Sequence, residues 1–132
     1  MLSYKTEIPV RFNEADPLGI VWHGEDCREA FGKAYGISYL DFYANNLAVP
    51  IVSIQCEYKK PLRYGDTILV QALYKPTVAA KLIFDYEIFD TRKNELVATG
   101  SSTQVFVDAK TFQLQLVTPD FFQHWKEKMN LS

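Results

Sequence analysis

The chain divides into segments whose hydrophobic residues recur with one of two periods, one typical of strands and one typical of helices. Residues 3–13 alternate between apolar and polar side chains, which predicts a strand. Residues 14–22 contain a proline and a glycine and predict a loop. Residues 24–35 have a helical period, with Arg28 and the other charged residues outside the apolar face, and Gly36 predicts the end of this helix. The apolar face comprises Cys27, Ala30, Phe31, Ala34 and Tyr35.

The period of two dominates the rest of the chain and predicts a run of strands. Short connections with turn residues, such as Tyr64-Gly65-Asp66, favour antiparallel neighbours. Thr118-Pro119-Asp120 predicts the start of a last helix, with Thr118 as its N-cap. The predicted strands are residues 49–58, 67–74, 82–89 and 96–107. Less regular segments predict a short helix or turn at 38–45 and a strand or strand extension at 113–117. The side chains expected to dock the last helix are Phe121, Phe122 and Trp125.

These elements fit an α+β architecture in one domain covering residues 1–132. A helix of about 12 residues, roughly 18 Å long, covers only part of such a sheet. Because uncovered faces and edge strands invite pairing with another copy, we expect a homo-oligomer.

Composition narrows the function classes. The chain is 48% hydrophobic, which excludes intrinsic disorder, and its net charge of -2 argues against a nucleic-acid partner. The charged, alternating start does not look like a signal peptide, and no apolar run is long enough to span a bilayer. Two cysteines without a CxxC motif indicate reduced thiols, so we expect a cytoplasmic protein.

The segment with the clearest chemistry is residues 13–24, Asn-Glu-Ala-Asp-Pro-Leu-Gly-Ile-Val-Trp-His-Gly. Its carboxylate, Asp16, stands shortly before a predicted helix whose free backbone N–H groups can polarise a carbonyl. A carboxylate in that place can act as base or nucleophile in acyl transfer. On the spacing alone, the favoured interpretation of Asp16 is a turn residue before Pro17.

Two motifs resemble those of hotdog-fold thioesterases of the 4-hydroxybenzoyl-CoA type. One is Asp-x-x-Gly-Ile-Val-Trp-His, starting at Asp16, and the other is the segment 58–66, Tyr-Lys-Lys-Pro-Leu-Arg-Tyr-Gly-Asp. The resemblance implies a central helix wrapped by a curved antiparallel sheet of about five strands, with a C-terminal helix. It further implies an acyl-CoA substrate, active sites at the interface of a dimer or tetramer, and neither a metal nor a cofactor.

Carried over position by position, the resemblance makes Asp16 the nucleophile or the general base for water. The amide of His23 would be the helix-start donor to the thioester oxygen, and Gly19 would keep the active-site loop clear of side chains. Trp22, Lys59, Lys60 and Arg63 are the substrate-binding candidates. The three basic residues suit CoA phosphates, although the favoured interpretation from the sequence is solvated turn charges.

The chain departs from the family after Gly24, where about six residues, roughly 9 Å of helix, are missing. Either the helix is truncated or its register moves. The residues expected to fill the gap are Phe31, Tyr35, Tyr39 and Phe42.

Other side chains offer alternatives. His23 and Cys27, four residues apart, could form a nucleophile or metal pair, but two ligands without a third are too few, so a capping histidine and a buried cysteine are expected. His124 is expected at the surface of the last helix. The alternative catalytic acids are Glu14, Glu25 and Asp26, of which Glu25 approaches the pocket if the helix shifts. The competing functions are a hotdog dehydratase and a non-catalytic acyl-CoA-binding or interaction module. The acyl group cannot be read from the sequence.

Overall fold

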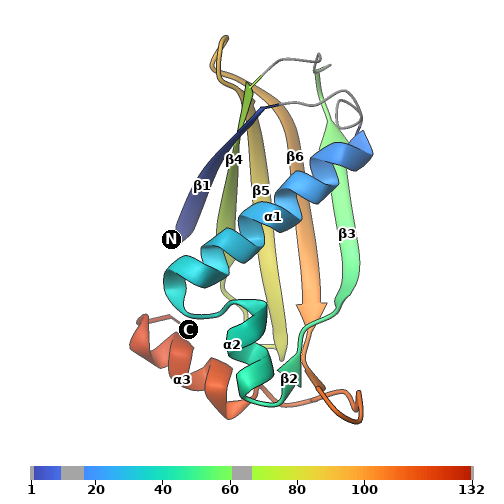
Figure 1. The fold of residues 1–132 in the computed structure, drawn as a ribbon, viewed down its shortest axis with the longest axis vertical. Coiled ribbons are helices and arrows are strands. Elements are labelled where there is room, and N and C mark those ends of the chain that lie inside the picture. Colours follow the sequence, from blue (N-terminus) through green and yellow to red (C-terminus); the bar gives the residue numbers. More distant parts are fainter. Residues whose placement is uncertain (1, 10–16, 61–66, 132) are drawn as a thin grey trace.

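A five-stranded antiparallel sheet curves around one long helix (Figure 1). The computed structural model describes residues 2–9, 17–60 and 67–131, and for residues 17–25 the backbone alone. The strand order is β1-β4-β5-β6-β3. The main strands are β1 (Ser3–Pro9), β3 (Ile51–Tyr58), β4 (Thr67–Lys75), β5 (Lys81–Asp90) and β6 (Glu95–Val105). The other elements are α1 (Pro17–Tyr35), α2 (Tyr39–Ala44), the short pair β2 (Leu47–Ala48) and β7 (Val107–Asp108), and α3 (Asp120–Lys128).

Helix α1 is longer than the sequence predicts. It has 19 residues and begins at Pro17, so the prediction of a loop up to residue 22 is wrong for residues 17–22. Proline suits the first helical position, because its fixed φ is helical and its missing N–H would have no partner there. The helix is therefore about 28 Å long. The apparent deletion after Gly24 does not truncate it, because residues 17–23 are helical as well.

The buried stripe of α1 also differs from the predicted one. Cys27 and Phe31 are fully buried as expected, but Ala34 is exposed and Arg28 is fully buried. The prediction that Arg28 lies outside the buried face is wrong. The stripe is rotated toward Arg28 because the chain turns sharply at the end of α1 and brings α2 over that side. Gly36, with φ of 85°, makes this turn, as predicted.

The buried side chains of β4 and β5 form the core under α1, and they alternate strictly with more exposed ones. Every second side chain of these strands is buried, which confirms the predicted period of two. The two strands are joined as antiparallel neighbours, and so are β5 and β6. The buried side chains of β4 and β5 are Ile68, Val70, Ala72, Tyr74, Leu82, Phe84, Tyr86, Ile88 and Asp90.

Strand β3 pairs with β6 and not with β4, so the prediction that every successive strand pairs with the next one is wrong there. Two strands, β5 and β6, lie between β3 and β4, which puts them three strand spacings, about 14 Å, apart. The connecting residues 59–66 reach this far, since eight extended residues span at most about 26–29 Å. The turn Tyr64-Gly65-Asp66 lies outside the described residues.

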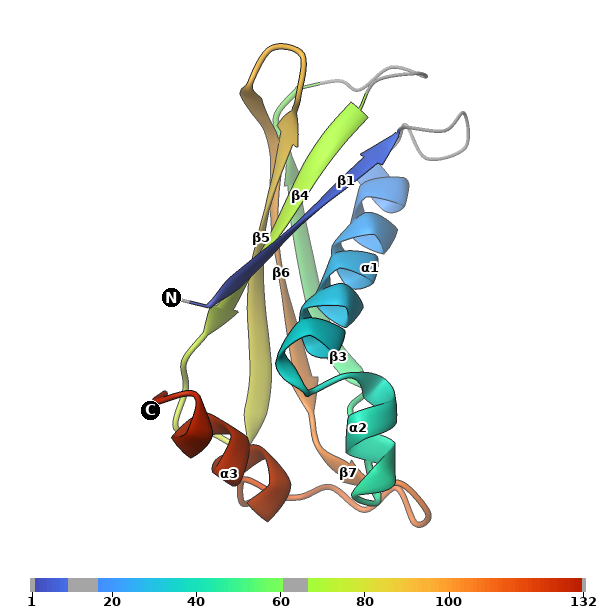
Figure 2. The same ribbon diagram turned by 60° about the vertical axis from the view of Figure 1, so that its left-hand side comes forward.

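The remaining elements close one end of the core (Figure 2). A capping box starts α2, in which Ser38 and Asp41 exchange hydrogen bonds. Helix α3 begins one residue later than predicted, with Pro119 as N-cap in place of Thr118, and it docks through buried Phe122 and Trp125 with Phe121 packed beside them. Residues 113–117 do not form a strand, and their one link to β7 is an isolated bridge from Leu114 to Val107.

Within the described part of the chain, no helix is both long and apolar enough to cross a membrane.

Candidate active site

The amino end of α1 directly follows the predicted carboxylate in the sequence. Asp16 directly precedes the first helical residue, Pro17, and lies outside the described residues. The first amides of a helix have no partner within it, and proline has no N–H. The free donors among the helical residues are therefore those of Leu18 and Gly19, where the helix dipole also favours negative charge.

The bounds of α1 change the place of the motif residues. Gly19 lies in the first turn, and Trp22 and His23 lie in the second. The prediction that the helix starts at His23 is therefore wrong. In a regular helix, an amide in the second turn bonds to the carbonyl four residues earlier, which for His23 is that of Gly19.

The basic cluster after β3 is partly neutralised. Lys59 Nζ lies 3.4 Å from a carboxylate oxygen of Glu57, and Lys60 pairs with Glu95. The backbone amides of both lysines point to the carbonyl of Val97, which anchors them to β6. Exposed pairs of this kind contribute little to stability. A phosphate would have to compete with the two carboxylates for these lysines. The third member of the cluster, Arg63, lies outside the described residues.

Cys27 has the surroundings of a structural thiol. Its Sγ donates to the carbonyl oxygens of Val70 and Tyr4, at 3.4 and 3.5 Å. Burial raises the pKa of this thiol, with a smaller contribution in the same direction from Asp26. Reactive cysteines have a lowered pKa, so the arrangement supports the buried-cysteine interpretation over a nucleophile. Asp26 and His124 are exposed, the latter on α3 as predicted.

The predicted gap-filling residues divide between core and surface. Phe31 and Phe42 are fully buried, Tyr35 is half-buried, and Tyr39 is 37% exposed. Phe31 packs edge-on against Phe84 of β5, with ring centroids 4.8 Å apart.

The sequence interpretation missed a polar cluster under α1. Arg28 Nε donates to the side-chain oxygen of Gln104 on β6 at 3.0 Å, and both residues are fully buried. The amide nitrogen of Gln104 in turn donates to the carbonyl of Val49 at 2.7 Å. A signal was present, because Arg28 stands three residues before Phe31 and four before Gly32, which is helical spacing to the buried face.

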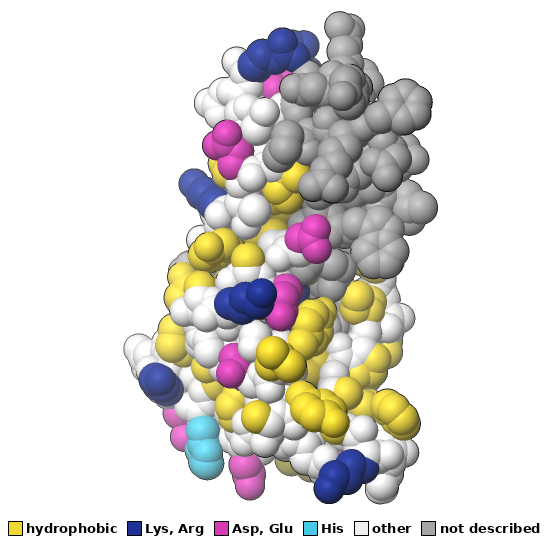
Figure 3. All heavy atoms as spheres, in the orientation of Figure 1, with side chains coloured by type: hydrophobic (Ala, Val, Ile, Leu, Met, Phe, Trp, Pro, Cys, Tyr) yellow, Lys and Arg dark blue, Asp and Glu magenta, His cyan; other side chains and the backbone are white. Residues whose placement is uncertain are grey.

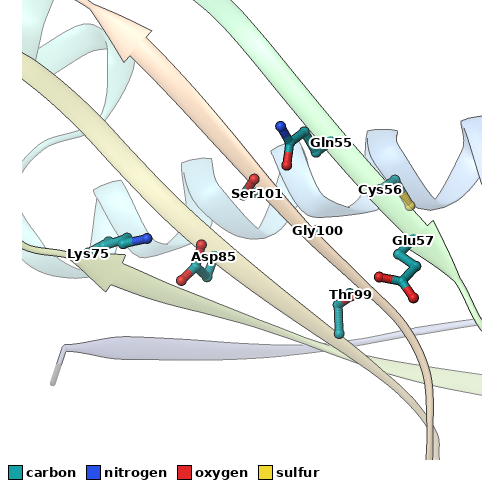
Figure 4. Close-up of a pocket in the computed structure, with 8 residues that line it drawn as sticks. All are labelled: Gln55, Cys56, Glu57, Lys75, Asp85, Thr99, Gly100 and Ser101. Atoms are coloured by element: carbon teal, nitrogen blue, oxygen red, sulfur yellow. The ribbon is translucent and has the colours of Figure 1, made fainter.

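In the part of the chain that the structure describes, the hollows away from the motif include one on the sheet and one beside α2. A polar trough of about 470 Å³ crosses the face of the sheet opposite to α1 (Figure 4). An apolar groove of about 250 Å³ lies between α2 and β2, with Tyr39, Tyr43 and Val49 among its walls. No three His, Cys, Asp or Glu side chains of the described residues gather as metal ligands. The trough is lined by Gln55, Cys56, Glu57, Lys75, Asp85, Thr99, Gly100 and Ser101.

Comparison with known proteins shows which family this chain belongs to. The model of the thioesterase-like superfamily matches residues 10–125, which include the Asp16 motif. The chain belongs to this superfamily. It is 33% identical over 126 residues to YneP of Bacillus subtilis, provisionally named an acyl-CoA thioesterase, covering 89% of this chain and 91% of that protein. It is also 28% identical to a 1,4-dihydroxy-2-naphthoyl-CoA hydrolase of Nostoc punctiforme, covering 96% of this chain and 88% of the relative.

Solved structures of thioesterases share the fold. The DHNA-CoA thioesterase of Staphylococcus aureus superposes with a TM-score of 0.81 at 25% identity, covering 98% of this chain and 92% of that one. A 1,4-dihydroxy-2-naphthoyl-CoA thioesterase from Synechocystis gives a TM-score of 0.79 at 18% identity, covering 98% of both chains. The expected hotdog fold and the resemblance to thioesterases are therefore confirmed.

Proposed function

We propose that this protein hydrolyses the thioester of an acyl-CoA, with Asp16 as the base or nucleophile at the amino end of α1. The observation that supports the proposal is the helix start at Pro17, which puts the free amides of a 19-residue helix directly after Asp16 in the sequence of a thioesterase-like chain. Those amides would hold the thioester oxygen as negative charge develops on it. The relatives named for acyl-CoA hydrolysis support the substrate class.

The proposal has two alternatives for the backbone amide that donates to the thioester oxygen. If α1 keeps its first two turns, the free amides among the helical residues are those of Leu18 and Gly19. The family resemblance implies the amide of His23, which becomes free only if those two turns open when substrate binds. Trp22, Lys59, Lys60 and Arg63 remain the proposed contacts to the substrate.

Thiol release from a panel of aliphatic and aromatic acyl-CoAs tests the proposal. Asp16→Asn keeps the size of the side chain and should lower kcat at least 100-fold, because the neutral amide is neither a base nor a nucleophile. Asp120→Asn is the matched control, since Asp120 is an exposed acid in the first turn of α3 and should leave kcat within twofold. Hydrolysis that survives Asp16→Asn would remove Asp16 from the mechanism. Binding of acyl-CoA without hydrolysis would favour the non-catalytic module.

The two roles of Asp16 differ in which molecule receives the oxygen atom of water, the enzyme or the acid product. As a nucleophile, the carboxylate bonds to the acyl carbon, the CoA thiolate leaves and takes a proton, and water then opens the mixed anhydride. When that water attacks the enzyme's own carboxyl carbon, its oxygen stays in Asp16. As a base, Asp16 takes a proton from water that attacks the acyl carbon directly, and the oxygen enters only the acid product. Incorporation of 18O into the Asp16 peptide after hydrolysis in labelled water, measured by mass spectrometry, therefore identifies Asp16 as the nucleophile.

We further propose that a second copy of the chain covers the β3 edge. Strand β3 ends the sheet, and its side chains are exposed from Ile51 to Glu57. Val52 is 58% exposed, and on the neighbouring α2 Leu40 is 77% exposed. Figure 3 shows apolar side chains gathered over this part of the molecule. An open, apolar edge strand is a template for pairing with another strand.

Light scattering after size-exclusion chromatography tests this self-association. Val52→Lys places a charge on the apolar edge and should shift the protein toward monomer. Val78→Lys makes the same change at a valine that is 90% exposed and not on β3, and should leave the mass unchanged. A monomeric wild type, or an unchanged mass for Val52→Lys, would contradict the proposal.

A further inference from the structure

We infer that Arg28 is a positioning residue that holds α1 in one register against the sheet, and so sets where the amino end of the helix stands. The inference rests on the proposed function for its consequence in catalysis. Its structural part stands on the contacts of Arg28 alone.

The guanidinium of Arg28 is held from two sides. Its Nε donates to Gln104 of β6 at 3.0 Å, and its Nη1 donates to the carbonyl of Ile37 in the turn after α1, at 3.4 Å. The guanidinium carbon also lies 4.7 Å from the ring centre of Tyr39 and 5.5 Å from that of Phe84. These contacts tie α1 to the sheet and to α2 at a single point.

The described residues compensate this buried charge poorly. The nearest carboxylate among them is that of Glu29, a partly exposed side chain with an oxygen 3.8 Å from Nη1. Nη2 is buried and has no hydrogen-bond partner among the described residues. A buried ion of this kind adds little net stability, and the best-attested use of such groups is to select one register.

The other contacts of α1 with the sheet are neutral. Cys27 Sγ donates to the carbonyl of Val70 at 3.4 Å and the Tyr35 hydroxyl donates to that of Ser3 at 3.1 Å, while Phe31 packs through apolar contacts, which have no direction. Of the described α1 side chains that bond to the sheet, Arg28 alone carries a charge, so its displacement is the costliest. A slide by one turn, 5.4 Å, would separate Arg28 from Gln104 and leave a buried charge without its partner. The hydrogen bond between Arg28 and Gln104 therefore penalises every register except one.

The link to catalysis is the stiffness of the helix. Arg28 lies eleven residues after Pro17, about 16 Å along the axis. A rigid helix carries a displacement at Arg28 unchanged to its amino end, where the thioester oxygen would bind. Misplacement of a reacting group by 1 Å can lower the rate about 100-fold.

The test compares Arg28→Met, which keeps the length and apolar contacts of the side chain, with Phe122→Leu, a core change on α3. For Arg28→Met we expect kcat to fall at least tenfold with KM changed less than threefold, and the NMR cross-peaks between the rings of Phe31 and Phe84 to weaken. For Phe122→Leu we expect both to stay as in the wild type at equal fraction folded. Arg28→Lys keeps the charge but not the Nε donor, and should show the same changes in smaller size.

The outcomes separate the inference from the proposed function. If Arg28→Met retains the Phe31–Phe84 cross-peaks and loses no more kcat than the control, the inference is overturned. If the wild type hydrolyses nothing while the cross-peaks are lost in Arg28→Met alone, the register role stands and the proposed function fails. If Arg28→Met does not fold, the same two readouts on Arg28→Lys decide.

Discussion

Gly32 of α1 should not tolerate the one methyl group that usually strengthens a helix. A Cβ built on Gly32 would lie 2.6 Å from the carbonyl oxygen of Ile37 and 2.9 Å from the Cα of Ser38. Both atoms belong to the backbone of the turn between α1 and α2. That turn cannot move away freely, because the amides of Gly36 and Ile37 both donate to the carbonyl of Gly32, at 2.9 and 2.8 Å. We therefore expect Gly32→Ala to destabilise the protein.

The magnitude follows from two opposing contributions. Alanine in place of glycine in a helix contributes about 1 kcal/mol of stability. Overpacking of a closed site costs about 1–3 kcal/mol, and the upper end applies here because the obstructing atoms are backbone. The net loss in the free energy of unfolding is then about 2 kcal/mol. For a domain of this size, this corresponds to a fall in Tm of roughly 8 °C.

Urea unfolding followed by tryptophan fluorescence measures this loss directly. Gly36→Ala serves as the comparison, because no described atom lies within 4 Å of its added Cβ, but φ is 85°. Its cost is that of the left-handed conformation alone, about 1–2 kcal/mol. A Gly32→Ala variant as stable as the wild type, or more so, would refute the tight approach of the turn to α1.

Three further measurements test other contacts. Burial raises the pKa of Tyr74 to about 12, whereas tyrosine in an unfolded chain ionises near pH 10. The folded state therefore holds this proton longer, stability falls as the pH rises from about 10 to 12, and Tyr74→Phe should remove much of that fall in Tm. In a Cys56→Ser background, Cys27 should react with a thiol reagent only on unfolding, because its Sγ is buried, and rapid reaction of the native protein would contradict this burial. In a continuous α1 the amide of His23 should exchange slowly with solvent, so fast exchange would show that the first two turns are open.

The sequence predicted elements whose pattern depends on local chemistry. The alternation in β4 and β5, the stop at Gly36 and the docking of α3 through Phe122 and Trp125 are all confirmed. In each case a side-chain period or a special residue carries the information, and nothing distant in the chain alters it. The Asp16 motif belongs to the same class, since it leads to a family that the comparison confirms.

The errors occur where a tertiary contact overrides the local pattern. The local helical pattern predicts that Arg28 is a solvated charge. Its buried hydrogen-bond partner, Gln104, lies 76 residues later in the chain. The sequence pattern places the start of α1 too late, because Ile20-Val21-Trp22 has no helical period of its own. The sequence also does not predict that β3 lies beside β6, because the turn residues after Tyr58 do not determine which strand is the neighbour of β3 in the sheet.

By itself, the sequence therefore determined the α+β class through its hydrophobic periods, and the resemblance of its motifs to a known family indicated the hotdog fold and the candidate carboxylate. The tertiary structure decided which strands are neighbours, where α1 begins, and that a charged side chain lies beneath it. Hydrogen bonds such as that between Arg28 and Gln104 join residues far apart in the chain. Their geometry exists only after the sheet has formed, and no local period encodes it.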